Sequence, residues 1–450
     1  MKIVTRAILL LLAVFSVFTC VSCTKREIQT GIVEEGYTPN VSGRVRMSAY
    51  VGSSDIENAA VRAFARAFEA KYPEAHVDVD ISIVGQDATA TRIASGDIGD
   101  VFFFWEEDTY KYAVANNAIM NLTQYIAPLG IDLGNIYSGT LDLGRVNGKI
   151  YMVARDHTHV AMTYNRDALR SAGLEDPSED WTWEEFKDYC EKLTIIGDDG
   201  YYDQIGAYID YQYGPCFIPL LQGWGGVWVD TINKKVDLTS ENVTKGVGEV
   251  IDLMSLGYIL PIGATGEFMK SFSRVSGSII SCVFNTSVFP DFASRGKSYE
   301  TYGVDWDACS FFSYPTHAVG AGATGYGVYN RTTNPDTAAA LALFFYTEEG
   351  QIAHNGQTGG SVPNVRSLAL DDFWRVGSTP DKNYDAYVSF PDCDVVGKFE
   401  CRMPPEVAAI VRNGVASIFS NHFSGKANYT DTMAKLETQA NEKWRTLYGG

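Results

Sequence analysis

The stretch from Gly148 to Asn165 most constrains how this chain can fold. An apolar run of strand length ends at Arg155-Asp156, and a second β-prone run starts at His159. This pattern predicts two strands joined by an extended segment instead of a turn. We expect the chain to pass here from one lobe into another, so residues 155–159 are candidates for the wall of a ligand cleft. The alternative is a surface loop within one domain.

Length and charge narrow the class of protein. With 450 residues the chain is too long for one ordinary core, and 46% hydrophobic residues suffice to bury two or three. The formal net charge is −19, the acids are spread along the chain, and no cluster of Lys and Arg stands out. This composition argues against nucleic acid and against an anionic membrane surface as partners.

The first 22 residues have the pattern of an export signal. Lys2 and Arg6 precede an apolar run too short to span a bilayer. The run ends in Cys20-Val21-Ser22-Cys23, which resembles a bacterial lipobox. We therefore expect a signal peptide over 1–22, acylation of Cys23, and a lipid-anchored polar tether over 23–43. Cys20 stands where Leu is usual, so it remains a weaker candidate for the lipidated residue.

Export places the other cysteines where disulfides can persist. Six cysteines allow 15 pairings, among which the sequence does not choose. No CxxC pair occurs, which argues against a structural zinc site. These six are Cys190, Cys216, Cys282, Cys309, Cys393 and Cys401.

Alternating strands and helices predict an α/β first lobe. Strands are expected over 45–51, 77–83 and 100–105, with a helix from Ser54-Glu57 and another ending at Gly96. Ligands of open α/β sheets bind beyond the carboxyl ends of the strands. Trp105, Glu106 and Glu107 are therefore candidate ligand-binding residues, whereas Asp108 is expected to cap a helix through Asn116.

A series of short motifs follows one order over most of the chain after the signal segment. Its members are Phe64–Pro73, Ile93–Val101, Leu122–Ile126, Gly148–Tyr151, Tyr164–Leu174, Trp181–Phe186, Asn334–Asp336, Phe344–Thr347 and Gly359–Pro363. In this collinear order the chain resembles the extracellular solute-binding proteins, family 1, that serve ABC-type sugar importers.

The resemblance implies a periplasmic-binding-protein-like α/β fold, in which two lobes are joined by three hinge crossings with a ligand cleft between them. We expect crossings near 155–159, 313–316 and 348–349. The first lobe would then comprise 44–154 and 317–347, and the second 160–312 and 350–450. The resemblance also implies a monomer outside the cytoplasm, anchored to the bacterial membrane by its lipid, that delivers a carbohydrate to the permease of an ABC importer.

The second lobe is rich in aromatic residues over 201–228. Sugars present apolar C–H faces, so a flat ring suits them, and Trp224 beside paired glycines is our candidate stacking platform. Ordinary core packing is the alternative for Trp224. Trp181 and Trp183 open an amphipathic helix and are expected to pack it.

Two sequence patterns are only weak evidence for a nucleotide site or a metal site. Gly320-x-Gly322-x-x-Gly325 matches a dinucleotide fingerprint, but the residues after it predict a strand and not the helix that a pyrophosphate requires. His157 and His159 would share one face of a strand, yet spacing supplies no third metal ligand. We expect no metal site and no cofactor.

Three further candidates complete the expected binding site. They are Asp156 at the first crossing, Asn285 after an apolar run, and Ser361 in the last motif. Asn285 also fits a turn residue before Pro290. No nucleophile motif occurs, so we expect no catalytic residues and no enzyme. The alternatives are a binding protein for a metal ion or anion and an exported carbohydrate-active enzyme, whose paired carboxylates a sequence cannot reveal.

Overall fold

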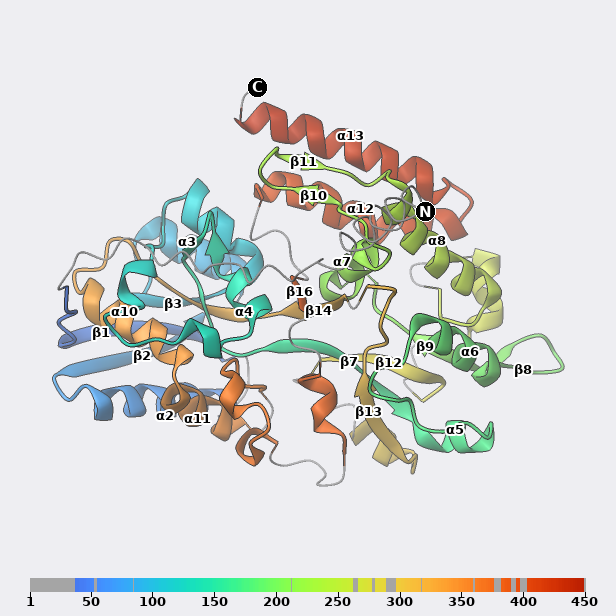
Figure 1. Cartoon of the computed structure of the whole chain (residues 1–450), viewed down its shortest axis with the longest axis horizontal. Coiled ribbons are helices and arrows are strands. Elements are labelled where there is room, and N and C mark those ends of the chain that lie inside the picture. Colours follow the sequence, from blue (N-terminus) through green and yellow to red (C-terminus); the bar gives the residue numbers. More distant parts are fainter. Residues whose placement is uncertain are drawn as a thin grey trace, which may run out of the picture.

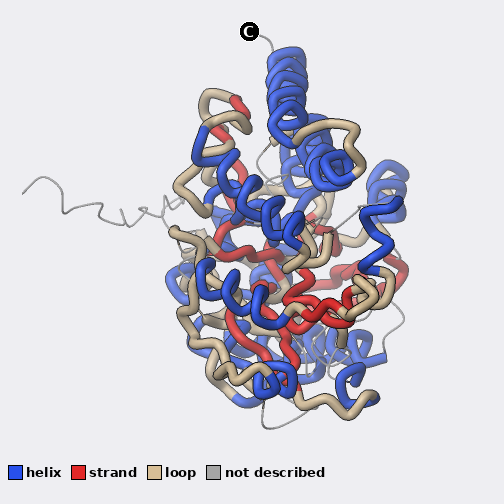
Figure 2. The backbone as a smooth tube through the Cα atoms, turned by 90° about the vertical axis from the view of Figure 1, so that its right-hand side faces the viewer, coloured by secondary structure: helices blue, strands red, loops and turns tan. Residues whose placement is uncertain are grey.

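The computed structural model describes residues 37–51, 55–83, 85–211, 213–261, 266–276, 280–288, 297–316, 318–358, 361–375, 382–389, 394–396 and 403–448. The protein has two α/β lobes side by side, and the long strand β7 runs across the middle of the molecule (Figure 1). The strands lie inside and the helices cover them (Figure 2). The mixed α/β architecture agrees with the fold class expected from the sequence.

The first lobe is built on a five-stranded sheet of order β2-β1-β3-β15-β6. β1, β2 and β3 run parallel, and β15 lies antiparallel between β3 and β6. Buried Val and Phe side chains dominate β3, as expected for a central strand covered on both faces. The strands are β1 (Gly43–Tyr50), β2 (Ala75–Ile83), β3 (Val101–Trp105), β6 (Val153–Ala154) and β15 (Thr324–Val328), beside a small hairpin of β4 (Arg145–Val146) and β5 (Lys149–Ile150).

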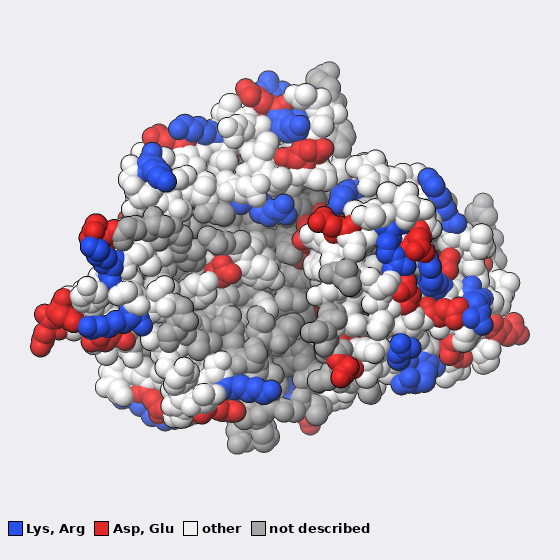
Figure 3. All heavy atoms as spheres, turned by 180° about the vertical axis from the view of Figure 1, so that it is seen from behind, with Lys and Arg blue, Asp and Glu red and all other residues white. Residues whose placement is uncertain are grey.

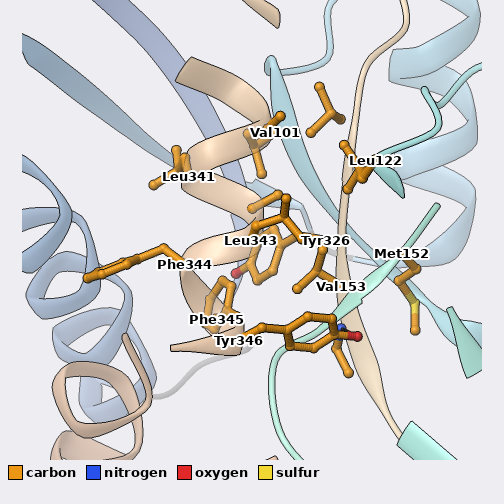
Figure 4. Packing of buried hydrophobic residues seen from close by; sticks show 14 of the residues in the cluster. Val101, Leu122, Met152, Val153, Tyr326, Leu341, Leu343, Phe344, Phe345 and Tyr346 are labelled. Carbon is orange, nitrogen blue, oxygen red and sulfur yellow. Dashed lines mark hydrogen bonds between the residues drawn. The ribbon is translucent and has the colours of Figure 1, made fainter. Parts of the chain in front are cut away.

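Aromatic rings join the helices of the first lobe to its sheet. Phe345 stacks on Tyr326 of β15 at 5.0 Å and on Phe64 at 3.8 Å. Figure 4 shows this core, in which Phe344 points toward the neighbouring helices and Tyr346 lies beside the strand that carries Val153. The helices are α2 (Asp55–Lys71), α3 (Gln86–Ser95), α4 (Ser138–Leu143), α10 (Pro335–Leu343) and α11 (Glu348–Thr358).

The second lobe is built on a seven-stranded mixed sheet around β7. β7 pairs antiparallel with β12, β13 and β14, whereas β12 runs parallel to β9. Its strands are β7 (Thr158–Asn165), β8 (Ile195–Ile196), β9 (Tyr202–Tyr208), β12 (Cys282–Val288), β13 (Trp306–Ser310), β14 (Val319–Gly322) and β16 (Asp394–Val396).

A capping motif in the sequence determines where helix α6 of the second lobe begins. Thr182 caps α6 and forms a capping box with Glu185, and Trp181 and Trp183 are buried around this helix, as predicted. A hairpin of β10 (Val229–Asp230) and β11 (Lys235–Val236) lies along the C-terminal helix (Figure 1). The helices are α5 (Arg166–Ser171), α6 (Trp183–Leu193), α7 (Gly214–Gln222), α8 (Glu241–Leu256), α12 (Pro405–Phe423) and α13 (Tyr429–Tyr448).

The second passage between the lobes differs from the expected one at 313–316. Phe311, Phe312 and Tyr314 are buried in the core of the second lobe, and β14 still belongs to its sheet. The chain joins the first-lobe sheet only at β15, so the passage lies at 322–324. The sequence placed it too early because an aromatic run before a glycine-rich strand has no local feature that marks a change of sheet.

The third passage also differs from the expected one at 348–349. α11 packs against α2 within the first lobe, and Lys71 pairs with Glu349. Val365 and Leu368 still belong to the first-lobe core, whereas Ala386 packs with residues of β7 and β13. The chain therefore changes lobe after 368 and before 386.

Other expectations have mixed outcomes. The residues after the glycine-rich motif belong to strand β15, as predicted, and not to the helix that a dinucleotide site requires. Cys190, Cys282 and Cys309 are buried free thiols. The signal segment, Cys20, Cys23, Cys393 and Cys401 lie outside the described residues. Within the described part of the chain, no helix is long and apolar enough to cross a membrane.

Candidate functional site

The parallel strands of the first lobe end where the chain crosses between the lobes. Trp105, the last residue of β3, pairs with Thr324, the first residue of β15. Glu106 and the two acids after it follow at once in a 3₁₀ turn. Because ligands of open α/β sheets bind beyond strand carboxyl ends, this edge is the candidate site on the first lobe.

The second lobe presents the same kind of edge to the crossing. β12 is parallel to β9, and its last residue, Val288, pairs with Val160 near the start of β7. The chain beyond β9 leads to Tyr213, whose backbone N–H donates to the carbonyl of Asp210 before α7 begins. The carboxyl ends of parallel strands from both lobes therefore face the crossing.

Side chains from the two lobes meet at Gly322. A Cβ atom at this glycine would lie 3.3 Å from Oε1 of Glu106 and 3.5 Å from Oη of Tyr213. Glu106 is 2% exposed and comes from the first lobe, whereas Tyr213 precedes α7 of the second. A carboxylate and a phenol from opposite lobes thus lie side by side at the base of the junction.

Two glycines of β14 allow this close approach. A Cβ atom at Gly320 would lie 1.6 Å from the carbonyl oxygen of Pro215, so the strand presses directly on the first turn of α7. The same substitution at Gly322 would meet only the ends of side chains. Gly320 therefore serves backbone packing at the junction, whereas Gly322 leaves room for the side chains of Glu106 and Tyr213.

The carboxylates around the junction have different surroundings. Burial raises the pKa of the Asp108 carboxyl, although Lys111, whose Nζ donates to its Oδ1 at 3.0 Å, opposes the shift. Glu107 accepts a hydrogen bond from Nε2 of Gln86 at 2.6 Å. Asp156 is 4% exposed, and its Oδ2 accepts from Nε of Arg155 at 3.0 Å and from Nη2 at 2.9 Å.

Asp108 differs from its expected role as a helix cap. The structure has a 3₁₀ turn over Glu106–Asp108 and a π-helix over Lys111–Ala115 in place of one α-helix. The Asp108 carboxylate pairs with Lys111 one turn later.

Aromatic residues flank the carboxylates on the first lobe. The ring of Trp105 lies 5.3 Å from that of Tyr50 and 5.0 Å from that of Phe103, both in edge-on geometry. Trp105 is partly buried, so part of its surface stays accessible at the end of β3. An aromatic face beside acids can contact both the C–H faces and the hydroxyls of a sugar.

Two predicted ligand residues lie away from this edge. Trp224 is at the opposite end of α7 from Tyr213, and its ring packs 5.9 Å from Trp183 and 5.2 Å from Tyr314. Asn285 lies mid-strand in β12, where its Nδ2 donates to the carbonyl of Cys282 and to Oη of Tyr299. The structure brings Trp105, Glu106, Glu107 and Asp156 together at the crossing, but not Trp224 or Asn285.

Ser361, the last predicted ligand residue, and His157 lie in the buried segments that meet at the first crossing. Ser361 is buried beside Val362, which forms a β-bridge with His157. The ring of His157 stacks on Tyr137 at 4.3 Å, and its Nδ1 lies 2.8 Å from Oγ1 of Thr140. Among the described residues, no group of three or more His, Cys, Asp or Glu side chains could hold a metal ion.

Comparison with known proteins settles the family. The model of the bacterial extracellular solute-binding proteins matches residues 63–377, which is most of the chain. The chain belongs to this family. The match begins within α2 and ends before β16, so it leaves out β1, β16, α12 and α13 but includes both edges of the junction.

Solved structures show the same fold at low sequence identity. The sugar-binding protein MalE from Xanthomonas citri has a TM-score of 0.69 at 16% identity, and the match covers 91% of this solute-binding protein and 100% of that chain. The ABC substrate-binding protein Lmo0181 from Listeria monocytogenes, in complex with cycloalternan, has a TM-score of 0.68 at 18% identity. This match covers 89% of the present protein and 99% of Lmo0181. UgpB from Mycobacterium tuberculosis, in complex with glycerophosphocholine, has a TM-score of 0.66 at 16% identity. This match covers 90% of the present protein and 99% of UgpB.

Sequence reasoning found one wall of the candidate site and missed the role of the other. The rule of strand carboxyl ends singled out Trp105, Glu106 and Glu107 on the first lobe. Applied to the second lobe, the same rule would have favoured Tyr213, which follows β9 and precedes α7. The sequence favours Trp224 instead, because it stands beside paired glycines in a span rich in aromatic residues.

Proposed function

We propose that this solute-binding protein captures a carbohydrate between its two lobes and delivers it to the permease of an ABC importer. The protein binds its ligand without chemical conversion. Membership of the extracellular solute-binding family supports the delivery role, and the similarity to a cycloalternan complex and to a sugar-binding protein supports the substrate class.

The observation that carries the proposal is the meeting of Glu106 and Tyr213 at Gly322. Sugar hydroxyls both donate and accept hydrogen bonds, so a carboxylate acceptor and a phenol suit them. Because the two groups come from different lobes, a ligand that contacts both would bridge the lobes. Trp105 at the end of β3 supplies the aromatic face that pyranose rings favour.

The charges at the junction favour a neutral ligand over an anion. Glu106, Glu107, Asp108 and Asp156 gather there, and the buried guanidinium of Arg155 is held by Asp156. Acidic side chains around a binding site disfavour a phosphate group or a sugar acid by charge repulsion. On the face seen in Figure 3, Lys and Arg alternate with Asp and Glu, which suits neither nucleic acid nor a polyanion.

The proposed location is the outer side of the bacterial membrane, with the protein held by acyl chains on Cys23. The lipobox-like sequence supports this part of the proposal. Cys23→Ala should leave the precursor uncleaved or release the protein, whereas Cys20→Ala should do neither. Membrane retention of the Cys23→Ala protein after normal cleavage would contradict the anchor.

A thermal-shift screen of the protein without its signal segment tests the substrate class. The probes are maltose, maltotriose, cycloalternan and a panel of other mono- and oligosaccharides, with glycerophosphocholine as a non-saccharide. A ligand present at 100 times its Kd stabilises the folded state by about 2.7 kcal/mol. Stabilisation by glycerophosphocholine alone, with none by any sugar, would overturn the proposal.

A pair of variants tests the site with whichever sugar the screen identifies. Glu106→Gln keeps the volume of the side chain but removes the charge, and should weaken binding at least about tenfold. Glu74→Gln, at an exposed residue before β2, is the matched control and should bind normally. Equal affinities of the two variants would remove Glu106 from the site.

A further inference from the structure

The first two passages between the lobes form one two-stranded ribbon with a change of register. On the first-lobe side, Ala154 pairs with Gly325. On the second-lobe side, Thr158 pairs with Gly322. Three residues on one strand, 155–157, therefore stand opposite two on the other, 323–324. This is the arrangement of a β-bulge, which bends and twists a strand pair more than a regular ladder does.

Backbone groups at the bulge find partners on a third segment. The N–H of Arg155 donates to the carbonyl of Thr324 at 2.8 Å and keeps the ribbon closed. The N–H of His157 donates instead to the carbonyl of Val362 at 2.9 Å. The carbonyl of Arg155 accepts from Nε2 of Gln351 at 3.1 Å. Gln351 and Val362 of the first lobe thus hold the bulge and satisfy backbone groups that would be costly to bury without a partner.

Gln351 is the centre of this fastening. Its side chain is fully buried on α11, and Nε2 also donates to the carbonyl of Phe345 at 2.7 Å. Its Oε1 accepts from Nδ2 of Asn355 at 2.8 Å and from the backbone N–H of Asn364 at 3.0 Å. Both amide donors and both acceptor positions of Gln351 are therefore occupied.

A second amide extends the same fastening along the ribbon. Nδ2 of the fully buried Asn364 donates to the carbonyl of Ala154 at 2.6 Å. Because α11 packs on α2, the whole clamp moves with the first lobe. We define the clamp as Gln351, Asn355 and Asn364.

We propose that the Gln351 clamp, by holding the bulge at 155–157, sets the preferred angle between the lobes. On either side of the bulge, the two strands are paired and move with their own lobe. The change of direction therefore concentrates in the bulge, and the two passages bend together as one ribbon. Asp156, a candidate ligand residue, lies within the bulge, so contact with a ligand would act directly on the pivot.

The test measures the distance between the lobes without any ligand. Spin labels at Glu74→Cys on the first lobe and Asp188→Cys on the second, both exposed residues, report the distance distribution by pulsed electron resonance. The labelled protein without the introduced cysteines gives the background. Gln351→Met keeps an unbranched buried side chain of similar size but loses all four hydrogen bonds, and should shift or broaden the distribution.

Thr337→Val is the matched control. Thr337 is fully buried in the same lobe and exchanges two hydrogen bonds with the backbone of Ser42, far along the chain from the ribbon. Its loss should lower the melting temperature as Gln351→Met does, yet leave the interlobe distances unchanged. Equal distributions in wild type and Gln351→Met would overturn the proposal, and so would equal shifts in both variants.

Two measurements remain decisive if Gln351→Met does not fold. Gln351→Glu retains the acceptor for Asn355 and Asn364 but loses the donors to Arg155 and Phe345, and should still shift the distribution. In the wild type, the backbone amide of Asn364, which donates to Oε1 of Gln351, should exchange its hydrogen at least about 100-fold more slowly than in an unstructured peptide. An unprotected amide at Asn364 would overturn the clamp. Neither measurement requires a sugar, so a failure to bind carbohydrate would leave this inference intact.

Discussion

At the scale of single residues, the buried histidine His354 on α11 lies next to Asn355 of the clamp and can bind a proton. Its Nδ1 lies 2.8 Å from Oδ1 of Asn355, and its ring packs edge-on against Phe64 and Phe345. Burial lowers the pKa of His354 to about 3, and the charge of Arg155 adds to the shift. The native protein therefore keeps this histidine neutral.

This pKa predicts a loss of stability in mild acid. Above about pH 6.5 the histidine is neutral in both the folded and the unfolded chain. Between about 6.5 and 3 only the unfolded chain binds the proton, so the free energy of unfolding falls by up to about 1.4 kcal/mol per pH unit from this group. His354→Gln should remove that part of the slope in urea titrations at pH 7, 6 and 5.

The same titrations contain their own control. Between pH 7 and pH 9 the wild type and His354→Gln should differ by a constant amount, because His354 is neutral in both states there. Parallel curves from pH 7 down to pH 5 would show that His354 takes up a proton in the folded protein.

Trp224 gives the second prediction at this scale. Its ring packs against Trp183 and Tyr314, and a Cβ at Gly246 would lie 3.0 Å from it. Trp224→Ala should therefore lower the free energy of unfolding by about 2 kcal/mol or more, with less than threefold change in sugar affinity. Chemical denaturation and calorimetry measure the two effects. A tenfold loss of affinity at unchanged stability would restore the stacking role suggested by the sequence.

At the scale of elements, the contact of β14 with α7 joins the crossing to the second lobe. Gly320→Ala would drive a methyl group into the carbonyl of Pro215, and neither backbone segment can relieve the overlap by a rotamer change. We expect a loss of about 3 kcal/mol or more. Gly322→Ala is the matched control and should cost less than about 1 kcal/mol, because the nearest atom, Oε1 of Glu106 at 3.3 Å, can move.

Guanidinium denaturation of both variants separates the two glycines. If Gly320→Ala is as stable as Gly322→Ala, the strand does not press on the helix as described. A change of the m-value in Gly320→Ala alone would also indicate that α7 has left its place.

Elements with strong local patterns could be predicted from the sequence. Period-two alternation marked β2, an unbroken apolar run marked β3, and Gly96, whose φ is 75°, marked the end of α3. The place of α11 could not be predicted. Its assignment to the first lobe depends on Phe64 stacking with Phe345 and on the Lys71–Glu349 pair, which join distant parts of the chain. Local patterns carry no information about such contacts.

Only one wall of the candidate site could be predicted from the sequence. The wall formed by Trp105 and Glu106 follows directly from a strand end, which a sequence displays. The meeting of Glu106 with Tyr213 depends on the register of β3 with β15 and on the closeness of β14 to α7. Register is set by packing of the whole sheet, so no spacing rule gives it.

At the scale of the whole molecule, the position of the candidate residues predicts how the ligand changes the shape of the protein. Trp105, Glu106 and Asp156 lie at the first lobe or the crossing, whereas Tyr213 belongs to the second lobe. A ligand that touches both walls binds the closed arrangement more tightly than the open one, and this difference in affinity is the whole cause of closure. A ligand held by one lobe would shift nothing, however tightly it bound.

Small-angle scattering tests this prediction with a sugar found in the thermal-shift screen. At saturation, the radius of gyration should be smaller than in the free protein, because each lobe moves as a rigid body about the crossings. Glu74→Gln, at the exposed residue before β2, should show the same decrease. Glu106→Gln, studied at a sugar concentration that saturates it, should show a smaller one, since it loses a contact at the junction of the lobes. An unchanged radius, with binding confirmed by calorimetry, would mean that the lobes hold their ligand without closing, and that Glu106 and Tyr213 do not grip it together.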